Sequence, residues 1–212
     1  MKVAILSESP ADEEAIRILV EGVLNQRTFP VSFPPLLTRG WRGVLKILPS
    51  VLKHLHYRTD AEALVVSVDS DESPMHREEH KLPGGADGKC RLCQLQLKVI
   101  STRGQLRPRF GRPGLKIAIG VAVPAIEAWY RSGLDPRVSE TAWMLGLQSK
   151  SYPYTKLSLK KDVYGTERPS LALETKRATE EVERFRQQHQ LEILRNLFPV
   201  GFGSLVHDIR GW

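Results

Sequence analysis

The sequence predicts an α/β fold in which a mostly parallel sheet is flanked by helices. Three short apolar segments, residues 3–6, 63–68 and 115–123, have the composition of buried strands. Each is followed by a segment with helical character, and the connections between them are long. Strands that alternate with helices pair in parallel, because a crossover helix returns the chain to the same end of the sheet.

The first strand and the helix behind it have the clearest signals. Residues 3–6 are all apolar, and Ser9 and Pro10 suit the cap and the first position of a helix. Acidic residues at positions 12–14 favour the first turn, where the helix dipole is positive. The next apolar residues recur at the spacing of one helix face: Ile16, Leu19, Val20, Val23 and Leu24.

The middle of the chain continues this alternation. A short edge strand is expected at residues 29–33, followed by a break at Pro34 and Pro35. Residues 41–57 have helical spacing, although Pro49 should kink or divide that helix. Residues 63–68 are apolar at nearly every position, as in a strand covered on both faces.

After the second apolar strand, a polar, glycine-bearing loop is expected over residues 72–88. A helix over 92–100 and a buried strand over 115–123 follow, and Pro124 ends the strand. Residues 125–130 are expected to form the start of a short helix.

The last third of the chain is less regular. Residues 131–170 contain many turn signals, whereas residues 171–197 predict one long, highly charged helix. With a length of 212 residues, the chain is predicted to be a single domain. The segment 171–212 is expected to be its C-terminal helical extension.

The composition predicts a water-soluble, cytoplasmic protein. The hydrophobic fraction of 41% is ordinary, and no apolar run approaches the roughly 20 residues of a membrane span. The apolar stretch at residues 3–6 is too short for a signal peptide. The chain has only two cysteines, which excludes a disulfide framework.

Basic residues exceed acidic ones, with a net charge of +7 and a sequence pI near 9.5. The excess is gathered in two stretches, which could either surround a polyanion-binding pocket or form solvated loops. They contain Arg103, Arg107, Arg109, Arg112 and Lys116, and Lys150, Lys156, Lys160 and Lys161.

Carboxylates follow two of the predicted strands. Glu8 comes just after the first strand, and Asp69 and Asp71 follow the second. Because parallel strands end around one crevice, the three side chains should meet there. Asp69 and Asp71 should share one side of an extended strand end. The cluster predicts a Mg²⁺ or Mn²⁺ site, with Glu8 as ligand or general base. An Asp-x-Asp pair that only caps a turn is the alternative.

Two further residues are candidates at the same crevice. Glu127 follows a strand end as Glu8 does, and could join the catalytic cluster or simply favour a helix dipole. Lys160 is a candidate phosphate-binding residue. Trp129 and Tyr130 are expected in the core.

A separate metal-binding pattern lies in the loop segment 72–93. It consists of His76-x3-His80 followed by Cys90-x2-Cys93, and both cysteines of the chain belong to it. These ligand types and the Cys-x2-Cys spacing are typical of a structural zinc site. The alternative is two small helix residues with two solvated histidines.

Glu8 with its following helix, together with Asp69-Ser70-Asp71, resembles the TOPRIM domain of topoisomerases, primases and certain nucleases. The resemblance is greatest to compact, stand-alone bacterial TOPRIM-like proteins that form a domain of unknown function. In those the first motif reads Glu-Gly-x-Thr-Glu, whereas residues 8–12 here read Glu-Ser-Pro-Ala-Asp, which leaves the role of Asp12 open. The segments 123–129 and 198–202 are also similar to that family.

The resemblance implies a TOPRIM-like domain with residues 72–93 as an insertion, and a metal-dependent phosphodiesterase that cleaves DNA or RNA. It also implies an ATPase partner in bacterial defence or repair, for which the charged segment 174–195 could be the docking site. The alternatives are a non-catalytic adaptor that binds nucleic acid or the ATPase, and a primase-like nucleotide transferase. The sequence leaves the oligomeric state open.

Overall fold

The computed structural model describes residues 1–32, 40–109 and 111–212. Within them, one all-parallel sheet has the strand order β2-β1-β3-β4. The predicted α/β class with a parallel sheet is therefore confirmed. The strands are β1 (Lys2–Leu6), β2 (Phe29–Pro30), β3 (Ala63–Asp69) and β4 (Lys116–Ala122).

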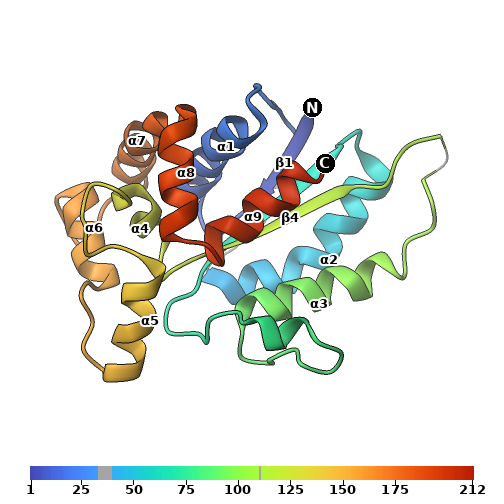
Figure 1. Ribbon diagram of the computed structural model, residues 1–212. Helices are drawn as coiled ribbons and strands as arrows, with labels where there is room; N and C mark the ends of the chain where they lie inside the picture. Colours follow the sequence, from blue (N-terminus) through green and yellow to red (C-terminus); the bar gives the residue numbers. More distant parts are fainter. Residues whose placement is uncertain (33–39, 110) are drawn as a thin grey trace.

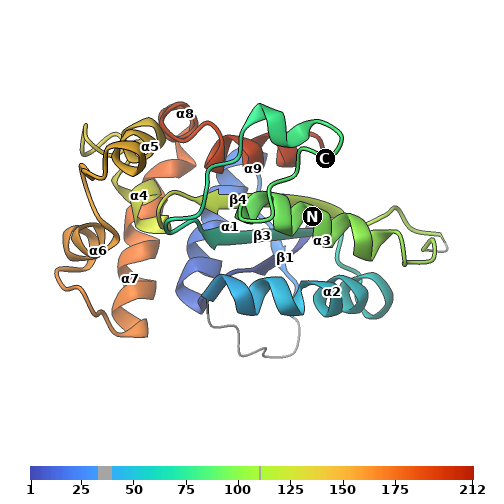
Figure 2. The ribbon, with the colours of Figure 1, turned by 90° about the horizontal axis from the view of Figure 1, so that it is seen from below.

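Helices cover both faces of this sheet (Figures 1 and 2). One face is covered by α1 (Pro10–Leu24) and α9 (Gly201–Arg210), and the other by α2 (Gly40–Arg58) and α3 (Arg91–Arg103). The helices α7 (Leu171–Val182) and α8 (Gln188–Leu197) pack against α1, and α8 also packs against α9. Three shorter helices lie beyond the carboxyl ends of the strands (Figure 1): α4 (Ile126–Arg131), α5 (Glu140–Ser149) and α6 (Lys156–Tyr164).

The strands divide their side chains between two cores because successive residues point to opposite faces. In β1, Val3 and Ile5 belong to the core under α1 and α9, whereas Ala4 and Leu6 belong to the core under α2 and α3. Burial on both faces explains why these strands read as continuous apolar runs. Among the described helices, none combines the length and apolarity needed to cross a bilayer.

Several helix signals of the sequence are present. Ser9 caps α1, since its hydroxyl accepts the Asp12 N–H at 3.2 Å, and Pro10 begins the helix. Of the two effects expected of Pro49, a kink or a division, the division does not occur, since α2 is one helix that contains this proline. The predicted edge strand is present only as β2, and Phe33, Pro34 and Pro35 lie outside the described residues.

The region predicted to be irregular, residues 131–170, contains α5 and α6. Both helices have hydroxyl caps that the turn-rich composition obscured: Ser139 caps α5, and Thr155 forms a capping box with Ser158 at α6.

The single helix predicted over residues 171–197 is also wrong, since α7 and α8 are separated by a 3₁₀ turn at Glu183–Arg186. The turn lets Phe185 enter the core with no exposed surface, close to Gly22 of α1. Residues 171–212 therefore supply part of the central core, including Leu194 and Phe202.

Gly201 is the position where α9 approaches β4 most closely. A Cβ there would collide with the backbone oxygen of Val121 and lie 3.3 Å from the Glu140 carboxylate. We expect Gly201→Ala to lower the free energy of unfolding by roughly 2–3 kcal/mol, because an overpacked core must shift its backbone. Thermal unfolding should show a decrease of roughly 4–12 °C. Gly211→Ala is the matched control, since its Cβ would meet nothing closer than 3.4 Å. Equal melting temperatures would contradict the close approach of α9 to β4.

Candidate functional site

Carboxylates gather where β1, β3 and β4 end. Glu8 follows β1, Asp69 is the last residue of β3, and Asp71 lies in the next turn. Glu127 lies in the first turn of α4, just after β4. Asp12, in the first turn of α1, is near enough to interact electrostatically with Glu8, Asp69 and Glu127. The structure thus brings the sequence-predicted carboxylates together and adds Asp12.

Backbone hydrogen bonds hold Asp69 in place between its neighbours. Its N–H donates to Glu8 Oε1 at 2.9 Å, and its Oδ1 accepts the N–H of Ile126 at 3.0 Å. The turn behind it is fixed to the end of β4, because Ser70 and Asp71 donate their N–H groups to the carbonyls of Ala122 and Pro124. One aspartate therefore links the ends of all three strands.

The side chains of Asp69 and Asp71 lie on the same side of the chain because of a turn, and not because side chains alternate along a strand. β3 ends at Asp69, and Asp71 has a left-handed backbone with φ 46°. Aspartate tolerates this conformation better than most residues do. The predicted extended strand end is therefore wrong, and a tight turn returns Asp71 to the side of Asp69.

Two basic residues complete this cluster. The Lys156 ammonium lies 2.6 Å from Asp69 Oδ2 and 2.9 Å from Asp71 Oδ1. Arg91 donates to the Asp69 carbonyl and to Asp71 Oδ2, the latter at 2.8 Å. In the sequence, Lys156 was only one of several lysines in a basic stretch. The local signal for a helix there is Thr155, which caps α6 just before Lys156.

Burial is the largest influence on the pKa values of these carboxylates. It raises the pKa of Glu8 to about 7 and that of Glu127 to about 7, with a further contribution from the charge of Asp69 in both cases. The pKa values of Asp12 and Asp69 are raised by burial as well. Burial also acts on Asp71, but Lys156 and Arg91 together outweigh it and hold its pKa below the ordinary value. Glu8 and Glu127 are therefore partly protonated near neutral pH.

These pKa shifts predict how stability depends on pH without divalent metal. Glu8 and Glu127 ionise near pH 7 in the folded protein but near 4.5 when unfolded. Their contribution is therefore complete below pH 4.5 and is lost as the pH rises through 7. We expect the melting temperature in EDTA to decrease between pH 5.5 and 8.

The decrease should be smaller in Glu127→Gln, which has no charge to bury at high pH. Thermal unfolding at several pH values measures this, with the exposed Glu167→Gln as the control. An equal slope in all three proteins would show that Glu127 is not buried as a carboxylic acid.

The aspartates offer the donor chemistry that Mg²⁺ requires. Asp69 Oδ2 and Asp71 Oδ1 already converge on one cation, the ammonium of Lys156, and carboxylate oxygens are the protein ligands that Mg²⁺ prefers. However, the carboxylates are not arranged as a ready-made metal site. Among the described residues, the one group of three or more His, Cys, Asp and Glu side chains placed to hold a metal ion lies elsewhere.

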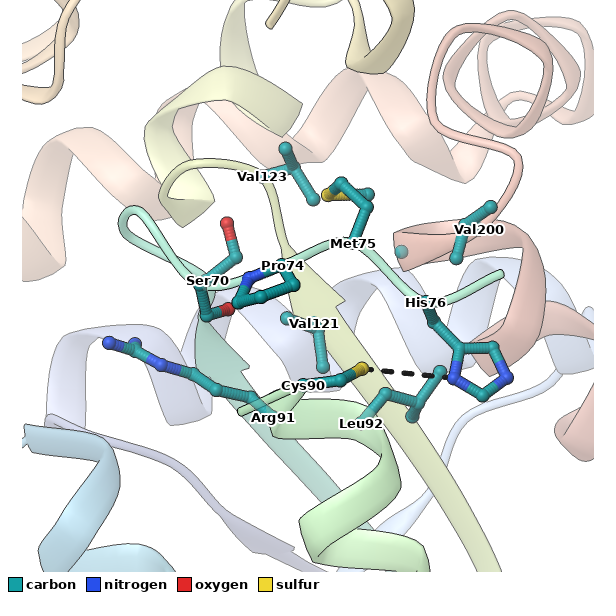
Figure 3. A pocket seen from close by; sticks show the side chains of 12 residues that line it. Ser70, Pro74, Met75, His76, Cys90, Arg91, Leu92, Val121, Val123 and Val200 are labelled. Atoms are coloured by element: carbon teal, nitrogen blue, oxygen red, sulfur yellow. Dashed lines mark hydrogen bonds between the residues drawn. The ribbon is translucent and has the colours of Figure 1, made fainter. Parts of the chain in front are cut away.

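That group is the predicted set His76, His80, Cys90 and Cys93, which could hold a metal ion. One ligand atom from each side chain lies within 4.8 Å of all the others. Cys93 Sγ is 3.3 Å from His76 Nδ1 and 3.5 Å from His80 Nδ1. Figure 3 shows Cys90 facing His76, at 3.8 Å, while the side chain of Arg91 extends the opposite way, from the first turn of α3.

Lys160 lies next to carboxylates as well. Its ammonium is 3.8 Å from Glu127 and 3.3 Å from Glu174 of α7. Trp129 and Tyr130 are fully buried, as the sequence predicts of core residues.

The arginine-rich stretch lies at the other end of the sheet. Arg109 and Arg112 donate to carbonyls of Thr59 and Ala61, which precede β3. Of the two alternatives for this stretch, a position around the acidic crevice is therefore excluded for Arg109 and Arg112, because the loop from α3 to β4 returns the chain to the amino ends of the strands (Figure 1).

No protein-family model, curated protein or solved structure matches this chain. The TOPRIM resemblance stays a prediction that rests on the residues quoted for it.

Proposed function

We propose that the chain is a Mg²⁺- or Mn²⁺-dependent phosphodiesterase that cleaves nucleic acid. The observation that carries the proposal is the pair Asp69 and Asp71, which converge on a single cation at the carboxyl ends of parallel strands. Ligands in open α/β sheets bind at these strand ends. The proposal draws further support from Glu8, whose carboxylate is fixed against the backbone of Asp69.

The chain's own residues suit hydrolysis of a phosphodiester. Asp69 and Asp71 would hold the metal, which polarises the phosphoryl oxygen and stabilises the charge that develops on it. Glu8, with a pKa of about 7, can take the proton from the attacking water near neutral pH. The oxygen of that water bonds to phosphorus and the P–O bond to the leaving group breaks. The departing alkoxide takes a proton from solvent, so that a phosphomonoester and an alcohol result.

Lys156 has a place in the same scheme. Its ammonium pairs with both aspartates. Because a lysine side chain has four rotatable bonds, the ammonium can leave the aspartates and pair with a substrate phosphate. Glu127 and Lys160 would form an outer part of the site.

A non-catalytic adaptor is the second candidate, and Lys156 is the observation that favours it. A lysine that permanently pairs with Asp69 and Asp71 would take the place of a metal, as in a site that binds without cleaving. Such an adaptor would bind nucleic acid or the ATPase partner implied by the TOPRIM resemblance. The exposed, charged surface of α7 is a candidate for that partner.

For the second metal site, we infer a structural zinc ion held by His76, His80, Cys90 and Cys93. Tetrahedral zinc, with Zn–S about 2.3 Å and Zn–N about 2.0 Å, places neighbouring ligand atoms about 3.3–3.8 Å apart. The measured S···N separations of 3.3, 3.5 and 3.8 Å fall in this range. Zinc would fix the loop between β3 and α3, and with it the position of Arg91.

A cleavage assay tests the proposed function. Single- and double-stranded DNA and RNA are incubated with Mg²⁺, Mn²⁺ or EDTA, and cleavage is expected only with the metals. No cleavage of any substrate, combined with salt-sensitive binding that needs no metal, would instead support the adaptor.

A further inference from the structure

A cleft of about 680 Å³ adjoins the carboxylates, and its walls come from five separate parts of the chain. The first turn of α2, the turn after β3, the start of α3, Pro124 after β4 and the region from α5 to α6 all contribute to it. Asp71 and Lys156 line the cleft and belong to the carboxylate cluster as well. A ligand in this cleft would therefore lie directly beside the residues assigned to cleavage.

Aromatic rings form two of its walls. On one side, Tyr152 packs on Trp143 with ring centroids 4.7 Å apart, and Tyr154 packs on the same tryptophan at 5.6 Å. Trp143 is buried, but Tyr152 is 37% exposed, so a fixed ring presents a face to the cleft. On the other side, Trp41 lies under the guanidinium of Arg91, 4.8 Å from the ring centroid. Rigid, partly exposed rings are stacking platforms for unpaired bases.

Positive charge accompanies these rings. Four basic residues line the cleft against two acidic ones, Asp71 and Glu72. Arg91 and Lys156 pair with the aspartates. In contrast, the exposed side chains of Arg42 and Lys89 make no ion pair and no side-chain hydrogen bond with any part of the chain that the structure describes. Cations without a partner at the rim of a cleft suit the phosphates of a nucleic acid backbone.

We propose that this cleft binds single-stranded nucleic acid, with a base stacked on Tyr152 and phosphates on Arg42 and Lys89. A duplex fits less well, because its bases are stacked on one another and have no face free for an aromatic side chain. The backbone would lead from the rim to Lys156 and the aspartates. This inference rests on the proposed function and names its substrate class.

Binding is best measured without cleavage. Fluorescence anisotropy in buffer without Mg²⁺ or Mn²⁺ compares a labelled oligothymidine with a hairpin duplex of the same length. We expect at least tenfold tighter binding of the single strand. A base stacked on an aromatic ring contributes roughly a factor of 5 to 150 in affinity, so Tyr152→Leu should weaken binding by an amount in this range. Leucine keeps an apolar contact with Trp143 but has no aromatic face.

The control is Tyr57→Leu, which changes an exposed tyrosine near the amino ends of the strands. It should leave binding unchanged. The double variant Arg42→Ala/Lys89→Ala should reduce the slope of log affinity against log salt by about 1.4, since each phosphate contact on a single strand contributes about 0.7.

Three results would overturn the proposal: no binding, equal or tighter binding of the duplex, or Tyr152→Leu behaving like Tyr57→Leu. The outcomes separate it from the nuclease assignment. Single-strand binding without cleavage in Mg²⁺ supports the cleft and refutes the nuclease. If Tyr152→Leu cleaves and binds as well as the wild type, the nuclease assignment is supported and the role of the cleft is refuted.

Discussion

Replacing Asp69 by asparagine should lower metal-dependent cleavage by about a hundred- to a thousandfold and leave the protein folded. This is the usual range when one electrostatic group that stabilises a developing charge is removed. Asparagine has nearly the same volume, and its side-chain oxygen can still accept the Ile126 N–H. What it lacks is the negative charge that now faces the Lys156 ammonium. Initial rates at saturating Mg²⁺ measure the effect.

Asp162→Asn is the matched control, because Asp162 is an exposed carboxylate on α6, the helix that begins with Lys156. It should cleave at the wild-type rate. Circular dichroism and thermal unfolding show whether both variants are folded. If folded Asp69→Asn cleaves within about threefold of Asp162→Asn, the carboxylate cluster is not the site of hydrolysis.

The variant Glu8→Gln distinguishes two possible roles of Glu8, general base and metal ligand. A base with a pKa of about 7 acts in its ionised form, so the wild-type rate should rise with pH up to about 7. Glutamine cannot accept the proton, and this rise should disappear in the variant. A lower rate with an unchanged pH profile would assign Glu8 to positioning instead.

The parallel core of the fold was predictable because each strand carries a local signal. β1, β3 and β4 are buried on both faces along most of their length and are therefore mostly apolar. Helices were harder to predict where long-range packing overrides local pattern. Phe185 enters the core and divides α7 from α8, and no proline or glycine stands between them in the sequence. Pro49, conversely, is a strong local signal for a break that α2 does not have.

The carboxylates of the site were predictable for a topological reason. Parallel strands end at one edge of a sheet, so residues that follow strands meet there whatever their separation in sequence. Lys156 was not predictable in the same way, because it follows a helix cap 87 residues after Asp69 and no strand precedes it. Asp12 was uncertain for another reason: it occupies a helix first turn, where an acidic residue needs no function.

The four residues of the proposed zinc site could be predicted because both their spacing in the sequence and their side-chain chemistry point to a metal ion. Cys90-x2-Cys93 brings two sulfurs to one side of the first turn of α3, and the histidines reach them from the preceding loop. Arg91 lies between the two cysteines in sequence and donates to Asp71. A metal ion at the cysteines would therefore restrain the arginine that donates to Asp71, one of the two proposed Mg²⁺ ligands.

Protein purified without added zinc should contain about one zinc ion per chain, and Cys93→Ser should contain almost none. Cys93 Sγ is close to both histidines, so its loss removes the ligand that has two of the three measured contacts. Because zinc that binds only the folded protein stabilises it, the melting temperature should fall. A loss of about 2 kcal/mol corresponds to roughly 4–8 °C in a chain of this size.

His189→Asn is the control for this measurement, since His189 is an exposed histidine on α8, remote in sequence from the cluster. It should keep its zinc and its melting temperature. Elemental analysis gives the zinc content independently of any activity. Wild-type protein without bound metal would contradict a structural zinc site, and so would a Cys93→Ser protein with full zinc and unchanged stability. If zinc is lost but cleavage is unaffected, the ion stabilises the loop without helping Arg91 to orient Asp71.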